Sequence, residues 1–283
     1  MYHFINLTSF FISQLPRQSL ESLARFLTFI FFRIFRLRQR LILQNLEIAF
    51  GNTKNPQEKA EIAQSSFYHF ILTALELLYF RNGDIACNMT MENAEPLIQA
   101  LARGEGAYVI AMHMSNWEAA ASGVAKQIKP VNVVVKKVGS PGLDRFITQL
   151  RTRNGMNVIV RKSAGDAIRA MRRVLKGGEI VAVILDQARP GEPFLPFFGK
   201  PAKTNTSFTA IWARIKAPIF IAYSTRSRVG EHVLHCKSEI FLKDTGNAQQ
   251  DIIDNSTHLN QVIETCIREC PQQYFWLHDR WKP

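Results

Sequence analysis

Short apolar runs alternate with helical patterns through the middle of the chain, and this alternation constrains the fold more than any other feature. Five runs rich in valine, isoleucine and alanine have the length of single strands: Ala107–Met112, Val131–Lys136, Asn157–Val160, Ile180–Leu185 and Pro218–Tyr223. Helical patterns separate them at Trp117–Ile128, Pro141–Arg153, Ala164–Leu175 and Thr206–Ile215. Apolar, β-branched strands that alternate with helices predict an α/β domain with a largely parallel or mixed sheet flanked by helices.

The flanking sequence extends this pattern. A helix is expected from about Pro56, a further strand at His232–Ile240 and a helix at Ile252–Ile267. The 283 residues are 47% hydrophobic and 20% charged, which is enough for a full core. We find no repeats and no low-complexity linker, so residues 46–283 are expected to form a single catalytic domain behind an N-terminal segment, 1–45.

The N-terminal segment is both apolar and basic. One helix is predicted over Leu20–Gln44, with arginines in one arc at Arg25, Arg33, Arg36 and Arg40. Because arginine interrupts every 18-residue window, a helix in the lipid headgroup region fits better than a membrane-spanning one. The alternative is a helix that packs on the domain with its arginines at the rim. The preceding run "FINLTSFFISQLP" could insert shallowly as well.

A net charge of +12 indicates anionic partners, such as nucleic acid, anionic membrane lipids or an acidic carrier protein. The basic residues at the N-terminus are interleaved with bulky apolar side chains, and no nucleic-acid-binding motif is present, so lipids are favoured over nucleic acid. Cys266 and Cys270 have no second pair to complete a metal site. Free thiols without a signal peptide indicate a reducing, cytoplasmic environment.

The stretch "AYVIAMHMSNWEAAASG" places a histidine where a buried strand ends and a helix begins. His113 would close the strand, and Glu118 would lie in the first turn of the helix, within reach of the imidazole. A carboxylate on one ring nitrogen would leave the other to take a proton. The alternative is a capping box, in which Ser115 and Glu118 only satisfy the start of the helix.

Other strand ends carry polar side chains to the same edge of the sheet. Arg161 follows "GMNVIV", and Asp186, Gln187 and Arg189 follow "IVAVIL". Carboxyl ends of parallel strands are where α/β folds place their sites, and this mixture suits an anionic substrate. The alternatives are a surface charge for Arg161 and a turn or helix cap for Asp186.

Five blocks of this sequence resemble one family in its own order. They are "RQRLILQNLEIAFG", "HMSNWE", "GMNVIVR", "LDQARPGEPFLPFFGKPAKTNTSFTAIWARIKAPIF" and "QYFWLHDRWKP". The chain resembles, over nearly its whole length, the bacterial lipid A lauroyl/myristoyl acyltransferase branch of the lysophospholipid acyltransferase superfamily. One departure is Ser115, which stands where glycine is usual, so the turn could differ in shape.

The resemblance implies roles for particular residues. His113 would be the general base and Glu118 its orienting carboxylate. The residues implied in substrate binding are Asn116, Arg161, Asp186, Gln187, Arg189, Phe197, Phe198 and Gly199. His278, Arg280 and Trp281 match the C-terminal signature, for which packing is the expected role.

The resemblance also implies a reaction. The enzyme would transfer a fatty acyl chain from acyl carrier protein or coenzyme A thioester to a hydroxyl of a lipid A precursor, without a cofactor. It would work at the cytoplasmic face of the inner membrane, held there peripherally or by a single N-terminal anchor. The alternative is another lipid acceptor: a lysophospholipid, a glycolipid or an aryl-polyene-type lipid.

Overall fold

One mixed sheet organises the molecule. The computed structural model describes residues 1–81, 83, 85–135, 140–160, 164–187 and 189–282. Its sheet has the order β1-β9-β8-β2-β5-β3-β4, and neighbours are parallel except β8 and β9. The strands are β1 Asn88–Glu92, β2 Ala107–Ala111, β3 Val131–Val135, β4 Met156–Val160, β5 Ile180–Ile184, β8 Ile219–Arg228 and β9 Glu231–Cys236. The predicted α/β class is confirmed.

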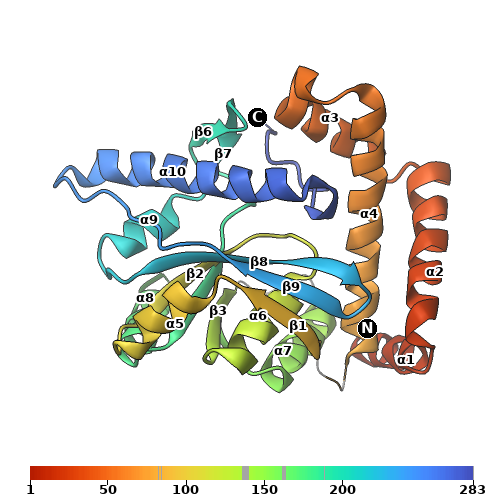
Figure 1. Cartoon of the computed structure of the whole chain (residues 1–283), viewed down its shortest axis with the longest axis horizontal. Helices are drawn as coiled ribbons and strands as arrows, with labels where there is room; N and C mark the ends of the chain where they lie inside the picture. Colours follow the sequence, from red (N-terminus) through yellow and green to blue (C-terminus); the bar gives the residue numbers. More distant parts are fainter. Residues whose placement is uncertain (82, 84, 136–139, 161–163, 188, 283) are drawn as a thin grey trace.

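Helices cover both faces of this sheet (Figure 1). On one face lie α5 Glu95–Ala102, α6 Trp117–Gln127 and α7 Pro141–Arg153; on the other lie α8 Ala164–Lys176, α9 Ser207–Trp212 and α10 Ala248–Glu269. Successive residues of β2 alternate between the two cores: Ala107 and Val109 face α5–α7, while Tyr108 and Ile110 face the other side. Burial on both faces explains why the central strands are continuously apolar.

The sequence did not predict the elements with weak signals. The polar edge strand β1, the short helix α5 and the hairpin of β6 Phe194–Phe197 and β7 Lys200–Lys203 were all missed. Pro196 argues against a strand because proline cannot donate to a ladder, but the isolated two-stranded hairpin tolerates it. The strand predicted to continue to Ile240 ends at Cys236.

The single helix predicted over Leu20–Gln44 is wrong in extent. The chain forms α2 Arg17–Thr28, a π-helical stretch η1 Phe29–Ile34 and, after a break, α3 Gln39–Phe50. Arg36 and Arg38 adopt φ of 51° and 57°, a left-handed conformation that a right-handed helix cannot contain. The four arginines therefore do not share one helical arc.

The N-terminal helices pack on α4 Pro56–Tyr79, which Asn55 and Glu58 open with a capping box. α1 Tyr2–Ser13 and α2 lie against α4, where Leu20 and Ala24 join a small core (Figure 1). α3 also packs on α4. Within the described part of the chain, no helix combines the length and the apolar composition needed to cross a membrane.

Candidate active site

His113 and Asp186 meet at the carboxyl ends of two neighbouring parallel strands. In the register of β2 and β5, Ala111 pairs with Ile184, so His113 and Asp186 each lie two residues beyond the last pair. One carboxylate oxygen of Asp186 is 2.8 Å from His113 Nδ1, and the other accepts the His113 backbone N–H at 2.7 Å. The carboxylate thus fixes both the ring and the backbone of the histidine.

The surroundings of this pair favour the ionised form of Asp186 and leave part of the His113 ring exposed. Asp186 is fully buried, which by itself would raise its pKa, but His113 and Arg280 outweigh burial and hold that pKa below its usual value. The His113 side chain is 17% exposed, and its ring contacts the rings of Trp117 and Phe275. Because Nδ1 faces Asp186, Nε2 is the nitrogen available to a substrate proton.

Glu118 does not contact His113, contrary to the sequence-based prediction. Its carboxylate accepts two hydrogen bonds from Arg151 on α7, at 2.9 Å from Nε and 2.6 Å from Nη2. The reason is where the helix starts: α6 begins at Trp117, and Glu118 in its first turn reaches Arg151 of α7. Asp186 occupies the place expected for Glu118, so the carboxylate comes from the neighbouring strand.

The capping box expected from Ser115 and Glu118 is also wrong. The cap of α6 is Asn116, whose side-chain oxygen accepts the Ala119 N–H at 3.1 Å. Ser115 adopts φ of 50°, a conformation that favours glycine, and its buried hydroxyl has no hydrogen-bond partner within the described residues. Ser115 therefore adopts a backbone conformation that glycine would adopt without strain.

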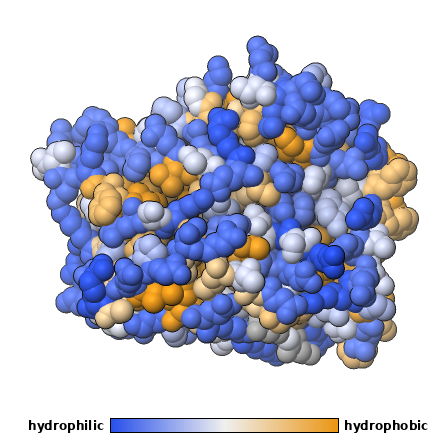
Figure 2. Space-filling model, in the orientation of Figure 1, coloured by the Kyte–Doolittle hydropathy of each residue, from blue (hydrophilic) through white to orange (hydrophobic). Residues whose placement is uncertain are grey.

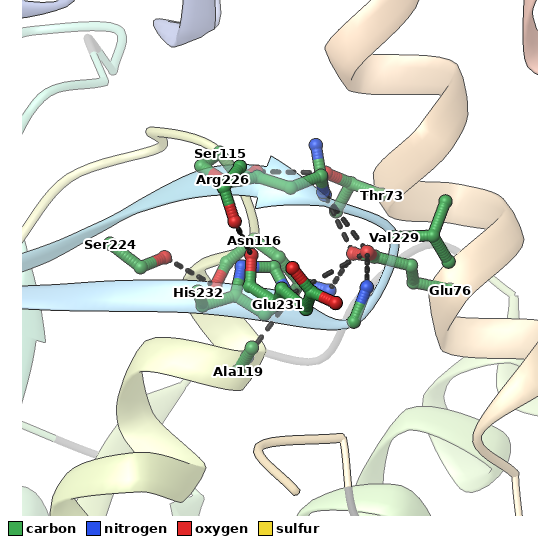
Figure 3. Close-up of polar contacts among 12 residues, drawn as sticks. Thr73, Glu76, Ser115, Asn116, Ala119, Ser224, Arg226, Val229, Glu231 and His232 are labelled. Atoms are coloured by element: carbon green, nitrogen blue, oxygen red, sulfur yellow. Dashed lines mark hydrogen bonds and ion pairs between the residues drawn. The ribbon is translucent and has the colours of Figure 1, made fainter. Parts of the chain in front are cut away.

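Buried charges hold the turn that follows His113 (Figure 3). Asn116 is fully buried and donates to Glu76 on α4 at 2.8 Å, so it positions the turn and is not open to a substrate. Glu76 also pairs with Arg226 of β8, at 2.6 Å from Nη2 and 3.0 Å from Nε, and accepts the Gly230 N–H. Burial would raise the pKa of Glu76, but Arg226 outweighs it and lowers that pKa.

Two side chains of α4 complete this support. Thr73 donates to the Ser115 carbonyl at 2.8 Å, and His69 Nδ1 lies 3.0 Å from Arg226 Nη1. Burial, and then the charge of Arg226, lower the pKa of His69 to about 3. His69 therefore stays neutral and accepts a hydrogen bond from the guanidinium. The helix on which the N-terminal helices pack therefore also fixes the turn that follows His113.

The other predicted site residues lie in different surroundings. Arg161 falls outside the described residues. Gln187 is half-buried beside Asp186, whereas Arg189 is exposed and lines a cavity. Phe197 and Phe198 are buried against the C-terminal segment, so they have a packing role and do not face a substrate. Gly199 is exposed, with φ of 70°, in the turn between β6 and β7.

An apolar cavity of about 290 Å³ opens at the ends of β3 and β5. Its walls come from these strands and from α8 and α9, and include Val134, Val183, Met171, Phe208, Ala210 and Ile211. Arg189 and Arg214 also line it. Val183 and Ile184, at the end of β5, line the cavity three and two residues before Asp186 in the sequence, whereas His113 and Asp186 are not among its lining residues.

A second surface stands out at the N-terminus. Large apolar side chains on α1, α2 and η1, and in the break before α3, are exposed, among them Phe4, Phe10, Phe11, Phe26, Phe29, Ile34 and Phe35. Arg25, Arg33, Arg36 and Arg40 are exposed in the same segment. Figure 2 shows apolar side chains at the right-hand edge, over α2. We call this set of residues the N-terminal apolar surface.

The carboxyl edge of the sheet thus carries both an imidazole that Asp186 fixes at one nitrogen and an apolar cavity. The chain matches the family model described as bacterial lipid A biosynthesis acyltransferase over residues 2–283. It therefore belongs to this family and is an acyltransferase, which confirms the resemblance seen in its motifs.

Individual relatives are distant but cover most of the chain. It is 23% identical over 279 residues to the lipid A biosynthesis lauroyltransferase of Escherichia coli strain K12, covering 96% of this chain and 88% of the relative. It is 22% identical over 252 residues to the lipid A biosynthesis palmitoleoyltransferase of the same organism and to a lipid A biosynthesis acyltransferase of Shigella flexneri. Each of these alignments covers 87% of this chain and 79% of the relative.

Proposed function

We propose that this enzyme transfers a fatty acyl chain from an acyl thioester to a hydroxyl group of a lipid A precursor. The observation that carries the proposal is the His113–Asp186 pair at the carboxyl edge of the sheet, the edge at which the apolar cavity also opens. The names of the relatives support a fatty acyl donor and a lipid A acceptor. The donor would be acyl carrier protein or coenzyme A thioester, and no further cofactor enters the reaction.

The proposed reaction uses both nitrogens of the His113 ring. His113 Nε2 removes the proton of the acceptor hydroxyl as its oxygen attacks the thioester carbonyl, which contributes about 10²–10⁴-fold to the rate. The buried carboxylate of Asp186 stabilises the imidazolium that forms. When the tetrahedral intermediate collapses, the carbon–sulfur bond breaks and the proton passes to the departing thiolate. The ester forms directly, without an acyl-enzyme.

The apolar cavity is the proposed site of the acyl chain. Its wall is formed mainly by aliphatic and aromatic side chains of β3, β5, α8 and α9, and β5 is the strand that leads to Asp186. Each methylene that moves from water into such a cavity contributes about 0.8 kcal/mol of binding free energy. Gln187 and Arg189, which follow β5 in the sequence, would contact the polar groups next to the chain.

The N-terminal apolar surface is the proposed membrane contact. Its phenylalanines would enter the boundary between headgroups and acyl chains, and its arginines would bind phosphates of anionic lipids. On this view residues 1–45 form a membrane-associating segment and residues 46–283 the catalytic domain, at the cytoplasmic face of the inner membrane, where thioester donors are made. The net charge of +12 would suit an anionic bilayer, a phosphorylated acceptor and an acidic carrier protein alike.

Mass spectrometry of total lipids tests the proposal. A Gram-negative host lacking its own late acyltransferases would express the wild type or His113→Ala. We expect a new acyl mass on lipid A with the wild type only. A new mass on a lysophospholipid, glycolipid or aryl-polyene-type lipid would keep the mechanism and replace the acceptor. No new mass on any lipid, with folded protein at the membrane, would overturn the proposal.

A further inference from the structure

Arg280, in the C-terminal segment, contacts the backbone of the His113–Asp186 pair. Its side chain is buried, and its Nη1 donates to the backbone carbonyl of Asp186 at 2.9 Å. Its Nη2 donates to Asn260 of α10 at 2.6 Å, and its guanidinium lies 3.8 Å from the centroid of the Phe197 ring. A guanidinium can make these three contacts at once because it is a planar fork of fixed geometry.

Several parts of the fold hold Arg280 in place. Asn45 of α3 donates to the carbonyls of Trp276 and His278, both at 2.8 Å, and so fixes the C-terminal segment. Asn260 in turn donates to Pro196 of β6. A side chain anchored from α3, α10 and β6 at the same time can hold the backbone of Asp186 to a single position.

The charge of Arg280 matters as much as its contacts. A fully buried carboxylate is costly unless a cation lies near it, and a neutral imidazole does not provide one. When His113 is neutral, as a base must be before it takes a proton, Arg280 supplies the positive charge that balances the Asp186 carboxylate. Without it, we expect the pair to keep an extra proton up to a higher pH, so that His113 is not free to act as a base.

We propose that Arg280 is the positioning residue and counter-charge of the His113–Asp186 pair, and that it keeps Asp186 ionised while His113 is neutral. The inference rests on the proposed function of that pair. It assigns a role to the C-terminal signature, for which the sequence indicated only packing.

Other titratable groups face the pair and must be separated from it. Burial raises the pKa of Tyr274 well above its usual value, and Asp186 adds to the effect. Burial lowers the pKa of His278, and raises the pKa of Glu192. The charge of Asp279 also acts on His278. Of these groups, His278 is a second imidazole whose own titration could produce an acid limb, so a His278→Gln variant belongs in the experiment.

The test is the pH dependence of kcat/KM for purified full-length enzyme with lauroyl-coenzyme A and a lipid A precursor in detergent. We expect Arg280→Gln to move the acid limb of the profile upward by about one pH unit, which means about tenfold lower kcat/KM on the acid side. Arg280→Lys keeps the charge but cannot make both hydrogen bonds, so it should lower kcat at every pH and leave the limb in place. His278→Gln should keep the wild-type limb.

Arg268→Gln is the matched control. Arg268 is exposed and lies over the neighbouring Phe198 ring, 4.6 Å from its centroid, so this variant loses one positive charge from the same region. It should leave the limb unmoved. An equal loss at every pH in Arg280→Gln, with an unmoved limb, would overturn the proposal and leave Arg280 a packing residue. If Arg280→Gln does not fold, a wild-type kcat in Arg280→Lys would overturn the proposal as well.

Two further variants separate this proposal from the function on which it rests. If His113→Ala and Asp186→Asn keep wild-type turnover, the pair is not the base and the proposed function fails. If both are inactive and Arg280→Gln does not move the limb, only the role of Arg280 fails.

Discussion

His113 and Asp186 lie opposite each other because β2 and β5 pair in parallel with Ala111 beside Ile184. The two strands end at the same level of the sheet, and two residues beyond this pair His113 Nδ1 lies 2.8 Å from a carboxylate oxygen of Asp186. A shift of one residue in this register would turn one of the two side chains to the other face of the sheet. The register of two central strands therefore determines which carboxylate serves the histidine.

Asp186→Asn should lower kcat by about 10²–10⁴-fold, because an amide can neither stabilise the imidazolium nor enforce the same tautomer. His113→Ala should abolish transfer. Turnover of a lipid A precursor with a radiolabelled acyl thioester measures both, and circular dichroism checks that the variants are folded. Wild-type turnover in folded Asp186→Asn would remove the carboxylate from the mechanism.

Glu118→Gln should cost stability and spare catalysis. Its carboxylate is buried in a two-bonded pair with Arg151, away from His113, so we expect a loss of about 1.5–3 kcal/mol in the free energy of unfolding. Urea unfolding gives this value, and kcat per folded molecule should match the wild type. A large fall in kcat with unchanged stability would instead favour the role that the sequence alone suggested.

His69 should make the fold sensitive to mild acid. Its pKa is about 3 in the folded protein and about 6.5 in the unfolded chain. Below pH 6.5 the unfolded chain binds a proton at His69 that the folded protein does not bind. The free energy of unfolding therefore has its full value above that pH and falls towards pH 3, by at most about 1.4 kcal/mol per pH unit.

Urea unfolding of wild type and His69→Gln between pH 7 and 4.5 measures this slope. Glutamine can still accept from Arg226 but does not titrate, so its slope should be smaller, with His278 supplying a remaining part. Glu76 also stabilises the fold less as the pH falls, but its lowered pKa means that this loss begins only below a pH of about 4.3. Identical slopes in both proteins above pH 5 would contradict the assignment to His69.

Replacing Phe26, Phe29 and Phe35 together by serine should weaken binding to anionic vesicles at least about 100-fold, because each exposed ring would contribute about 1.5–3 kcal/mol on insertion. Co-sedimentation with phosphatidylglycerol vesicles measures the partition coefficient. Phe241→Ser is the matched control, since Phe241 is 78% exposed but lies far along the chain from the N-terminal apolar surface. Equal losses in both variants would argue against that surface as the membrane contact.

Ala210→Phe should shorten the preferred acyl chain. The side chain of Ala210 lines the apolar cavity and is half-buried, so a ring at this position would fill space there without overpacking the core. Each methylene excluded would lower binding by about 0.8 kcal/mol, or roughly fourfold. Competition between acyl thioesters of about 10 to 16 carbons gives the preferred chain length. The control is Ala213→Phe: Ala213 is exposed and outside the cavity, so this variant should keep the wild-type preference.

The sequence by itself determined the elements with strong local signals. The runs at β2, β3, β4 and β5 are apolar and β-branched because both faces of the sheet are covered, and that pattern is visible without a structure. His113 at the end of β2 and Asp186 at the end of β5 were both expected at one edge. The motifs also indicated the family, because each motif is a short contiguous stretch.

Only the tertiary structure decided which side chains meet. Glu118 is five residues from His113 along the chain, yet the first turn of α6 points it to Arg151, while Asp186, 73 residues away, contacts the histidine through strand register. The break at Arg36 and Arg38, the buried Glu76–Arg226 pair and the reach of Arg280 to Asp186 likewise depend on packing between distant segments. A strong local pattern indicates a strand or a helix, but contacts over long separations depend on how the elements pack.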